Sequence, residues 1–259
     1  MNEFIVSEIE GCISTVTINS PSKHNALCLS AWKCLSSEIL KLNNNNNLRC
    51  IIIRGAGERA FSAGADISRF QVERSNAKQA MEYGYYVAKS LENLINCEIP
   101  LIAMISGVCA GGGLEIASCC DIRISSETAK FGIPINRIGH AFSPQEMKPV
   151  IRLLGLSTLL ELVLEGRMWT AEEALSRGLI NRMVPLEKLV EETQKTATNI
   201  SSGAPLAARM TKRMLRLLSS KGTVSQNDLK LCYSLCDTND YKAGVTAFLA
   251  KDKPKFNGN

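Results

Sequence analysis

An apolar run that leads into three glycines constrains the fold of this chain most. Residues 101–108 have the length and the β-branched content of a buried strand. Gly111, Gly112 and Gly113 then open a short amphipathic helix that carries Glu115 in its first turn. A helix start offers unpaired N–H groups and a positive dipole end, and glycine lets a ligand approach that backbone. The segment therefore predicts a site for an anion or a developing oxyanion, with Glu115 beside it.

The same order of strand, loop and helix recurs along the first two thirds of the chain. Its spacing is that of crossover units, which predicts an α/β fold with a largely parallel sheet. From residue 144 onward the pattern is helical, and residues 225–250 predict one long helix. No glycine- or proline-rich linker separates the two parts. We therefore expect a core over residues 1–195 and a helical region over residues 196–259, which packs on the core or on a neighbouring copy.

The charge of the chain favours small anionic ligands over nucleic acid. The 259 residues carry a formal net charge of +5, and their Lys and Arg residues are scattered. Aromatic residues make up only 5% of the chain, so a basic stripe with interleaved aromatics is missing. The basic stretch 209–216 keeps nucleic-acid binding as an alternative, but an amphipathic helix with a solvated face explains it more simply. A mildly basic protein suits phosphorylated ligands.

The cysteines and the lack of targeting patterns indicate a reducing compartment. Several of the ten cysteines lie inside apolar runs, where they resemble small buried hydrophobes. No repeated Cys-x-x-Cys pair suggests zinc, and with two histidines in the chain we expect no metal site. The first ten residues lack the order of a signal or transit peptide, and no apolar run approaches the roughly 20 residues of a membrane span. We therefore expect a cytoplasmic protein without a membrane partner.

Several separated segments resemble the crotonase, or enoyl-CoA hydratase/isomerase, superfamily. Residues 60–67 have the sequence Ala-Phe-Ser-Ala-Gly-Ala-Asp-Ile, and residues 107–121 contain Gly-Gly-Gly-Leu-Glu; together these two segments are specific. Residues 21–27 and 170–181 match two further segments, and residues 240–256 resemble the terminal helix of the family. The resemblance implies an α/β fold, a crotonase-like spiral of β-β-α repeats with a C-terminal helical trimerisation region. Such chains commonly assemble as a homotrimer or a dimer of trimers.

The resemblance also implies that the chain binds acyl-CoA thioesters and stabilises a thioester enolate. The backbone N–H groups of Ala63 and Gly112 would form the oxyanion hole, and Glu115 would carry a proton to or from the acyl chain. Burial favours the neutral form of Glu115, whereas a helix start favours the charged form. Coenzyme A is part of the substrate, so no separate cofactor is implied. Phe248 and Lys251 would reach the adenine end, including that of a neighbouring subunit's ligand. The residues expected along the substrate are Lys23, His24, Ala26, Ala65, Asp66, Ile67, Gly111, Ile135, Phe248 and Lys251.

The chain departs from the family pattern at Ile135. Hydratases of the family typically carry a second glutamate after the proline of a Phe-x-x-Pro-Glu segment, whereas Pro134 is followed here by Ile135. Glu115 must then act alone, or the reaction differs. A CoA-thioester-binding homologue without hydratase activity, or with another enolate reaction, therefore stays an alternative. His140 is either a substitute acid or base or a hydrogen-bonded structural residue. Gln145 and Glu146 are expected to start the next helix, and a catalytic role is the alternative.

Overall fold

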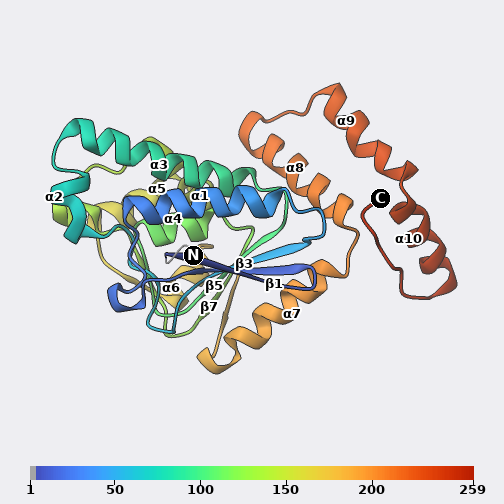
Figure 1. Cartoon of the computed structure of the whole chain (residues 1–259), viewed down its shortest axis with the longest axis horizontal. Helices are drawn as coiled ribbons and strands as arrows, with labels where there is room; N and C mark the ends of the chain where they lie inside the picture. Colours follow the sequence, from blue (N-terminus) through green and yellow to red (C-terminus); the bar gives the residue numbers. More distant parts are fainter. Residues whose placement is uncertain (1–3) are drawn as a thin grey trace.

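Strands of two sheets alternate along the chain (Figure 1). The computed structural model describes residues 4–259. In spatial order, the larger sheet contains β1 (Ile5–Glu10), β2 (Ile13–Ile18), β3 (Cys50–Gly55), β5 (Leu101–Ile105), β7 (Ile122–Ser126) and β10 (Arg182–Val184). The smaller sheet contains β4 (Ala60–Ser62), β6 (Val108–Ala110), β8 (Lys130–Gly132) and β9 (Trp169–Thr170). The pairs are parallel except for the β1–β2 hairpin and the β8–β9 pair.

The larger sheet is covered on both faces, which explains why its central strands are almost continuously apolar. In β3, Ile51 faces one hydrophobic core and Ile52 faces the other, because successive side chains of a strand point to opposite faces. The helices on the first face are α1 (Leu29–Asn43), α3 (Ala77–Asn96), α4 (Gly112–Cys119) and α5 (Pro144–Glu165). The helix on the second face is α7 (Leu189–Ser201). The short helices are α2 (Phe70–Glu73) and α6 (Ala171–Ser176).

The predicted strand over residues 101–108 is two strands in different sheets, so that prediction is wrong in its extent. β5 ends at Ile105, and β6 begins after a turn at Gly107. Gly107 has φ +60°, and a Cβ there would lie 2.0 Å from the carbonyl oxygen of Arg59. Only glycine accepts both the left-handed backbone and this contact. The turn passes the chain from the larger sheet to the smaller one, just before α4 begins.

The C-terminal helices extend away from the sheets (Figure 1). They are α8 (Pro205–Lys221), α9 (Gln226–Tyr233) and α10 (Asn239–Ala250). The prediction of one helix over residues 225–250 is wrong, because the chain breaks at Thr238. The Oγ1 of Thr238 accepts a hydrogen bond from Tyr241 N–H at 3.2 Å and so caps a new helix. The division at residue 195 stays a prediction, and its boundary falls within α7.

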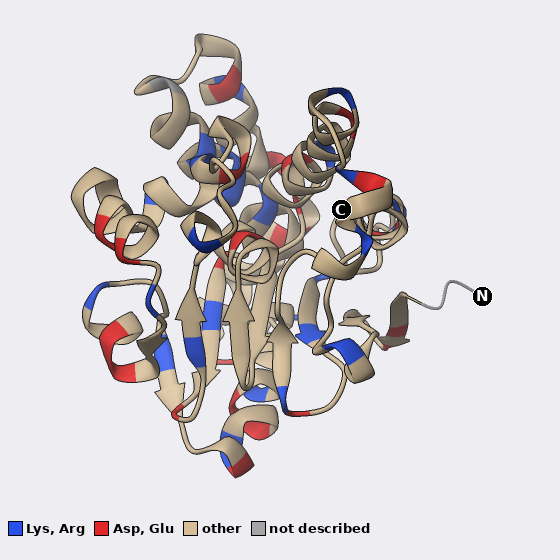
Figure 2. Cartoon of the chain, turned by 90° about the vertical axis from the view of Figure 1, so that its left-hand side faces the viewer, with Lys and Arg blue, Asp and Glu red and all other residues tan. Residues whose placement is uncertain are grey.

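Basic side chains attach α8 to the core. The basic face of residues 209–216, which we expected to be solvated, therefore packs in part against the core. Lys212 Nζ lies 2.6 Å from the Asp121 carboxylate. Arg216 donates to the carbonyl oxygen of Ile95 at 2.6 Å, and Arg209 donates to a carbonyl oxygen of the loop before β3 at 3.1 Å. Figure 2 shows both signs of charge interspersed over the helices and strands on the side it presents.

Two further features concern the whole of residues 4–259. No helix in this range is long and apolar enough to cross a membrane. Over the same residues, no three His, Cys, Asp or Glu side chains lie close enough together to hold a metal ion. The cysteines are all free thiols.

Candidate active site

Buried hydrogen bonds join the loop after β2 to the loop after β4. Asn25 is buried with φ +57°, and its Nδ2 donates to the first carbonyl oxygen of β4 at 2.7 Å. Leu27 N–H donates to Gly64 O at 2.7 Å, and Asp66 N–H donates to Leu27 O at 3.0 Å. The two loops thus form a short parallel bridge between Leu27 and Ala65.

This bridge places six of the predicted substrate-binding residues in two adjoining loops. Lys23 Nζ lies 2.7 Å from Asp66 Oδ2 and 3.2 Å from Ser68 Oγ. Burial acts to raise the pKa of the Asp66 carboxyl, but hydrogen bonds from Lys23 and Ser68 outweigh it and lower that pKa. Asp66 is therefore a charged partner that holds Lys23 beside the loop. The six residues are Lys23, His24, Ala26, Ala65, Asp66 and Ile67.

The start of α4 packs directly against the second loop. Gly64 has φ +90°, and a Cβ on it would lie 2.8 Å from Ala110 O and 3.0 Å from Gly112 N. A Cβ on Gly112 would lie 2.7 Å from Cζ2 of Trp32. Glycine at both positions therefore allows the two backbone segments to approach closely. Gly112 is the first residue of α4, so its N–H has no carbonyl partner inside the helix.

The N–H group of Ala63 is not free to bind an oxyanion, which corrects the prediction for that residue. It donates to the carbonyl oxygen of His24 at 2.9 Å. Within residues 4–259, no acceptor is found for the N–H group of Ala65. Ala65 and Gly112 line the same cavity. Ala65 and Gly112 therefore each bring to this cavity a backbone N–H for which no acceptor is found among the described residues.

A cavity of about 290 Å³ lies beside these two N–H groups. Its wall combines apolar side chains with a few charged ones, as small-molecule sites commonly do. The predicted site residues that it brings together are Ala63, Ala65, Ile67, Gly111, Gly112, Glu115 and Ile135. Its further lining includes Trp32, Phe70, Arg74, Tyr83, Arg137, His140 and Glu146. Lys23, His24, Ala26 and Asp66 lie in the adjoining loops and do not line it.

Glu115 is the most deeply buried charged group of the cavity. Only 4% of its surface is exposed, and no hydrogen-bond partner of its carboxyl group is found in the part of the chain that the structure describes. Burial, and then the charge of Glu146, raise the pKa of Glu115 well above its ordinary value, while Arg74 opposes this. The neutral form of Glu115 is favoured.

Glu146 is a second carboxyl of the cavity, beyond the role of helix start predicted for it. It lies in the first turn of α5, and only 7% of its surface is exposed. Burial raises the pKa of Glu146, although hydrogen bonding by Ser143 and the charge of Arg74 lower it. The order Ser-Pro-Gln-Glu at residues 143–146 signals the helix start. It does not reveal that this turn packs against α4.

Arg74 is a cation of the cavity that no sequence pattern indicated. Its guanidinium lies 4.8 Å from the ring centroids of both Phe70 and Tyr83, and it donates to Nε2 of His140. Burial and the charge of Arg74 lower the pKa of His140, so a neutral imidazole accepts this bond and its proton lies on Nδ1. His140 therefore orients Arg74, which agrees with the structural alternative for this histidine.

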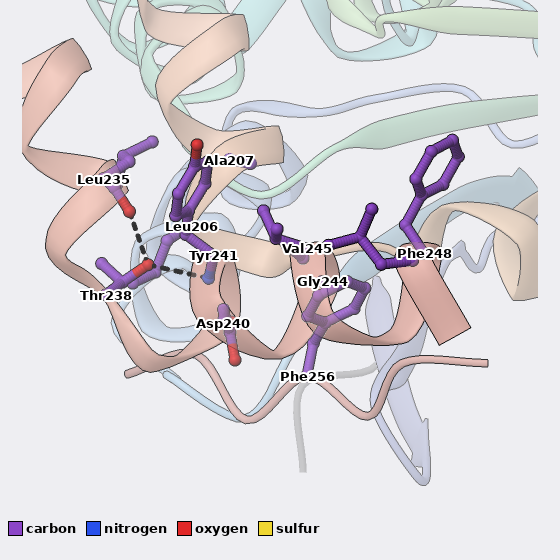
Figure 3. A pocket seen from close by; sticks show the side chains of 12 residues that line it. Leu206, Ala207, Leu235, Thr238, Asp240, Tyr241, Gly244, Val245, Phe248 and Phe256 are labelled. Atoms are coloured by element: carbon purple, nitrogen blue, oxygen red, sulfur yellow. Dashed lines mark hydrogen bonds between the residues drawn. The ribbon is translucent and has the colours of Figure 1, made fainter. Parts of the chain in front are cut away.

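The two predicted residues of the C-terminal helices lie elsewhere. Phe248 on α10 is 82% exposed and lines an apolar cleft of about 360 Å³, together with Tyr241 and Phe256 (Figure 3). Lys251 ends α10 with φ +57°. Neither residue lines the cavity that contains Glu115. Their contact with the ligand of a neighbouring subunit stays a prediction.

The chain is similar to enoyl-CoA hydratases over almost its whole length. The family model described as enoyl-CoA hydratase/isomerase matches residues 8–259. The short-chain-enoyl-CoA hydratase of Clostridium acetobutylicum is 32% identical over 255 residues, which cover 96% of this chain and 95% of that protein. The crotonyl-CoA hydratase of Syntrophomonas wolfei is 33% identical over 261 residues, with 98% of each chain covered.

The same likeness holds for solved structures. An enoyl-CoA hydratase/carnithine racemase from Magnetospirillum magneticum matches with a TM-score of 0.96 at 41% identity, covering 99% of this chain and 96% of that chain. This match confirms the predicted crotonase-like α/β fold with a helical C-terminal region. Sequence and structure agree, and the chain belongs to the enoyl-CoA hydratase/isomerase family.

Proposed function

We propose that the chain is an acyl-CoA enzyme of enoyl-CoA hydratase/isomerase type, with Glu115 as a proton-transfer group. One observation carries the proposal. Glu115 is a buried carboxyl, without a hydrogen-bond partner among residues 4–259, in the same cavity as the free N–H groups of Ala65 and Gly112. Burial of an unpaired carboxyl costs stability, and its raised pKa suits a group that gives and takes protons. The names of the relatives support the same reaction class.

The proposed oxyanion hole consists of the N–H groups of Ala65 and Gly112. A thioester oxygen gains negative charge when the acyl chain is added to or deprotonated, and two preorganised donors stabilise that charge. Loss of one such donor in other enzymes costs about 2.7–4 kcal/mol of activation free energy. Both donors are main-chain groups, so only a substitution that moves the backbone tests them.

The rest of the substrate is proposed to lie along the loops that the Leu27–Ala65 bridge joins. Lys23 at the edge of these loops suits an anionic phosphate group. Phe248 and Lys251 are proposed to contact the adenine end across a subunit interface of a homotrimer or a dimer of trimers. Coenzyme A belongs to the substrate in this proposal, which needs no separate cofactor. A cytoplasmic location is also proposed, on the reducing environment that the cysteines suit.

Replacement of Glu115 by glutamine tests the proposal. Purified wild type and Glu115→Gln are assayed for hydration of a short 2-enoyl-CoA and for isomerisation of the 3-enoyl compound. We expect kcat to fall by at least about 100-fold, the usual contribution of a positioned acid or base, while the Kd of a saturated acyl-CoA changes less than about threefold. Glu172→Gln is the matched control, because Glu172 is an exposed carboxylate in the first turn of α6. Unchanged turnover in Glu115→Gln would refute the proposed role.

A CoA-thioester-binding protein without hydratase activity is the second candidate, and Ile135 is the observation that favours it. Ile135 lines the cavity at the position where hydratases of the family carry their second glutamate. A screen with enoyl-, dienoyl- and malonyl-type CoA thioesters separates the two candidates. Tight binding without a product from any of them would favour this second function over the first.

A further inference from the structure

Glu146 brings a second carboxyl into the cavity from a different element. The family position of the second glutamate is Ile135, at the start of the 3-10 helix η3 (Ile135–Ile138), whereas Glu146 comes from α5. Both residues line the cavity of Glu115. We propose that Glu146 is the second proton-transfer group of this enzyme and acts as the base for water in the hydration of a 2-enoyl-CoA thioester. The proposal rests on the proposed function and names the reaction of that same site.

Glu146 is the third residue of α5, which is the position of a capping-box carboxyl. In α6 and α9 the residue at this position, Glu173 or Asp228, bonds back to the N–H of the capping residue. In α5 the cap Ser143 accepts from Glu146 N–H at 3.4 Å, and hydrogen bonding by Ser143 lowers the pKa of the Glu146 carboxyl. Unlike the other two residues, Glu146 is buried and lines a cavity, so its carboxyl can act in the cavity as well as at the helix start.

The charges around the cavity favour a single proton shared by the two carboxyls. Glu115 and Glu146 are buried and interact electrostatically, so ionisation of both is costly. Arg74 supplies one positive charge that lowers the pKa of both groups. The cavity therefore holds one carboxylate and one carboxylic acid beside the Arg74 guanidinium.

The surroundings decide which of the two carboxyls carries the proton. Glu115 is the more buried and lacks hydrogen bonds among the described residues, whereas Ser143 bonds to Glu146. Glu115 is thus the acid and Glu146 the carboxylate. The other polar side chains that line the cavity are a neutral His140, which binds Arg74, and the exposed Arg137 of η3. Trp32 and Tyr83 also line it, and Trp32 Nε1 donates to the Tyr83 hydroxyl.

This state of protonation suits the addition of water to a conjugated double bond. The Glu146 carboxylate takes a proton from water as the water oxygen bonds to the β-carbon. The electron pair of the double bond moves toward the α-carbon and the thioester oxygen, which the N–H groups of Ala65 and Gly112 hold. Glu115 gives its proton to the α-carbon, so the product is a 3-hydroxyacyl thioester. Passage of a proton from Glu146 to Glu115 then restores the starting state.

The proposal separates two activities that a structural role would affect together. A saturated acyl-CoA can exchange its α-proton with deuterium from solvent through the ionised form of Glu115, which takes the proton and returns a deuteron, while the addition of water needs Glu146 as well. Loss of the Glu146 charge lowers the pKa of Glu115 and so keeps this ionised form accessible. Glutamine at position 146 resembles the protonated form of Glu146. We therefore expect Glu146→Gln to lose at least about 100-fold in kcat for hydration and to keep the α-proton exchange within about fivefold of wild type.

The experiment compares wild type, Glu146→Gln, Glu115→Gln and the control Glu172→Gln in both assays. Hydration is followed by the absorbance of the enoyl thioester, and exchange is followed by mass spectrometry in deuterium oxide. Glu115→Gln should lose both activities, and Glu172→Gln should lose neither. Retained exchange also shows that Glu146→Gln is folded.

Four results would overturn the inference. Hydration by Glu146→Gln at the wild-type rate, with Glu115→Gln inactive, would remove Glu146 and leave the proposed function intact. Loss of both activities in Glu146→Gln would assign Glu146 a structural or α-proton role instead. A wild-type chain that exchanges α-protons but hydrates no enoyl-CoA would show that Glu146 does not activate water. A wild type with neither activity would overturn the proposed function as well.

Discussion

A methyl group at Gly112 should damage catalysis far more than it damages the fold. The added Cβ of Gly112→Ala would lie 2.7 Å from Cζ2 and 3.2 Å from Cη2 of Trp32. The Trp32 ring cannot easily yield, because it is fully buried and its Nε1 donates to the hydroxyl of Tyr83 at 3.1 Å. The start of α4 must therefore move by about 0.8 Å to reach an ordinary carbon contact of about 3.5 Å.

A shift of that size acts on the proposed oxyanion donor itself. Misplacement by about 1 Å can reduce a rate by about 100-fold, and full loss of one donor costs about 2.7–4 kcal/mol of activation free energy. We expect kcat for a 2-enoyl-CoA to fall by about 100- to 1,000-fold. The overpacking should lower the free energy of unfolding by only about 1–3 kcal/mol, which urea titration can measure.

Two controls make this prediction strict. Gly84→Ala adds a methyl to α3 where no atom outside the helix lies within 4 Å, so it should leave turnover unchanged and raise stability by up to about 1 kcal/mol. Trp32→Phe removes the outer ring carbons that the methyl would strike, so the pair Gly112→Ala with Trp32→Phe should be less impaired than the sum of the single variants. Wild-type turnover in a folded Gly112→Ala would refute the assignment of this N–H group.

Two further predictions concern stability. Burial raises the pKa of Glu115 in the folded chain, so ionisation of Glu115 at higher pH opposes folding. Glu115→Gln should therefore be more stable to urea than wild type at pH 8. The difference should become small near pH 4, just below the ordinary pKa of a glutamate, where the carboxyl is mostly protonated in both the folded and the unfolded chain. Equal stability at pH 8 would contradict the raised pKa. Lys212→Met removes the contacts to Asp121 and Ile99 O and should cost about 1.5–3 kcal/mol, with faster amide hydrogen exchange in α8 and unchanged exchange in α1. Unaltered exchange in α8 would show that these contacts do not hold the helix.

The parts of the site that could be predicted from the sequence are those set by local backbone chemistry. The glycine run and Glu115 lie within one short segment, and the helix start that they predict is present at Gly112. The joined loops could likewise be expected from the family segments around Lys23 and Asp66. By contrast, the prediction that the Ala63 N–H binds an oxyanion is wrong, because this group donates to the carbonyl oxygen of His24. Gly64, with φ +90°, reverses the backbone between Ala63 and Ala65, and no residue pattern states which N–H then meets the cavity.

The features that could not be predicted depend on contacts between distant elements. Arg74 follows a four-residue helix, and its place in the cavity comes from packing on Phe70 and Tyr83 and from its bond to His140. In the fold, periodicity predicted most helices but missed breaks that single residues impose. Thr238 interrupts an otherwise helical pattern because its side chain caps a new helix.

A carboxyl at position 146 can physically replace the glutamate that the family carries at the position of Ile135. Two-carboxyl hydration needs one acid and one base close together, wherever they lie along the chain. A carboxylate at the start of α5 gains the positive end of the helix dipole and the Ser143 hydrogen bond, and both favour its ionised form. Glu115 also lies in a first helical turn, yet it is more buried and lacks such a bond among the described residues. The surroundings thus favour a higher pKa for Glu115 than for Glu146, as an acid and a base need. In this proposal Ile135 therefore marks a relocated carboxyl, and Glu115 and Glu146 are the carboxyl groups among the described residues that line the cavity.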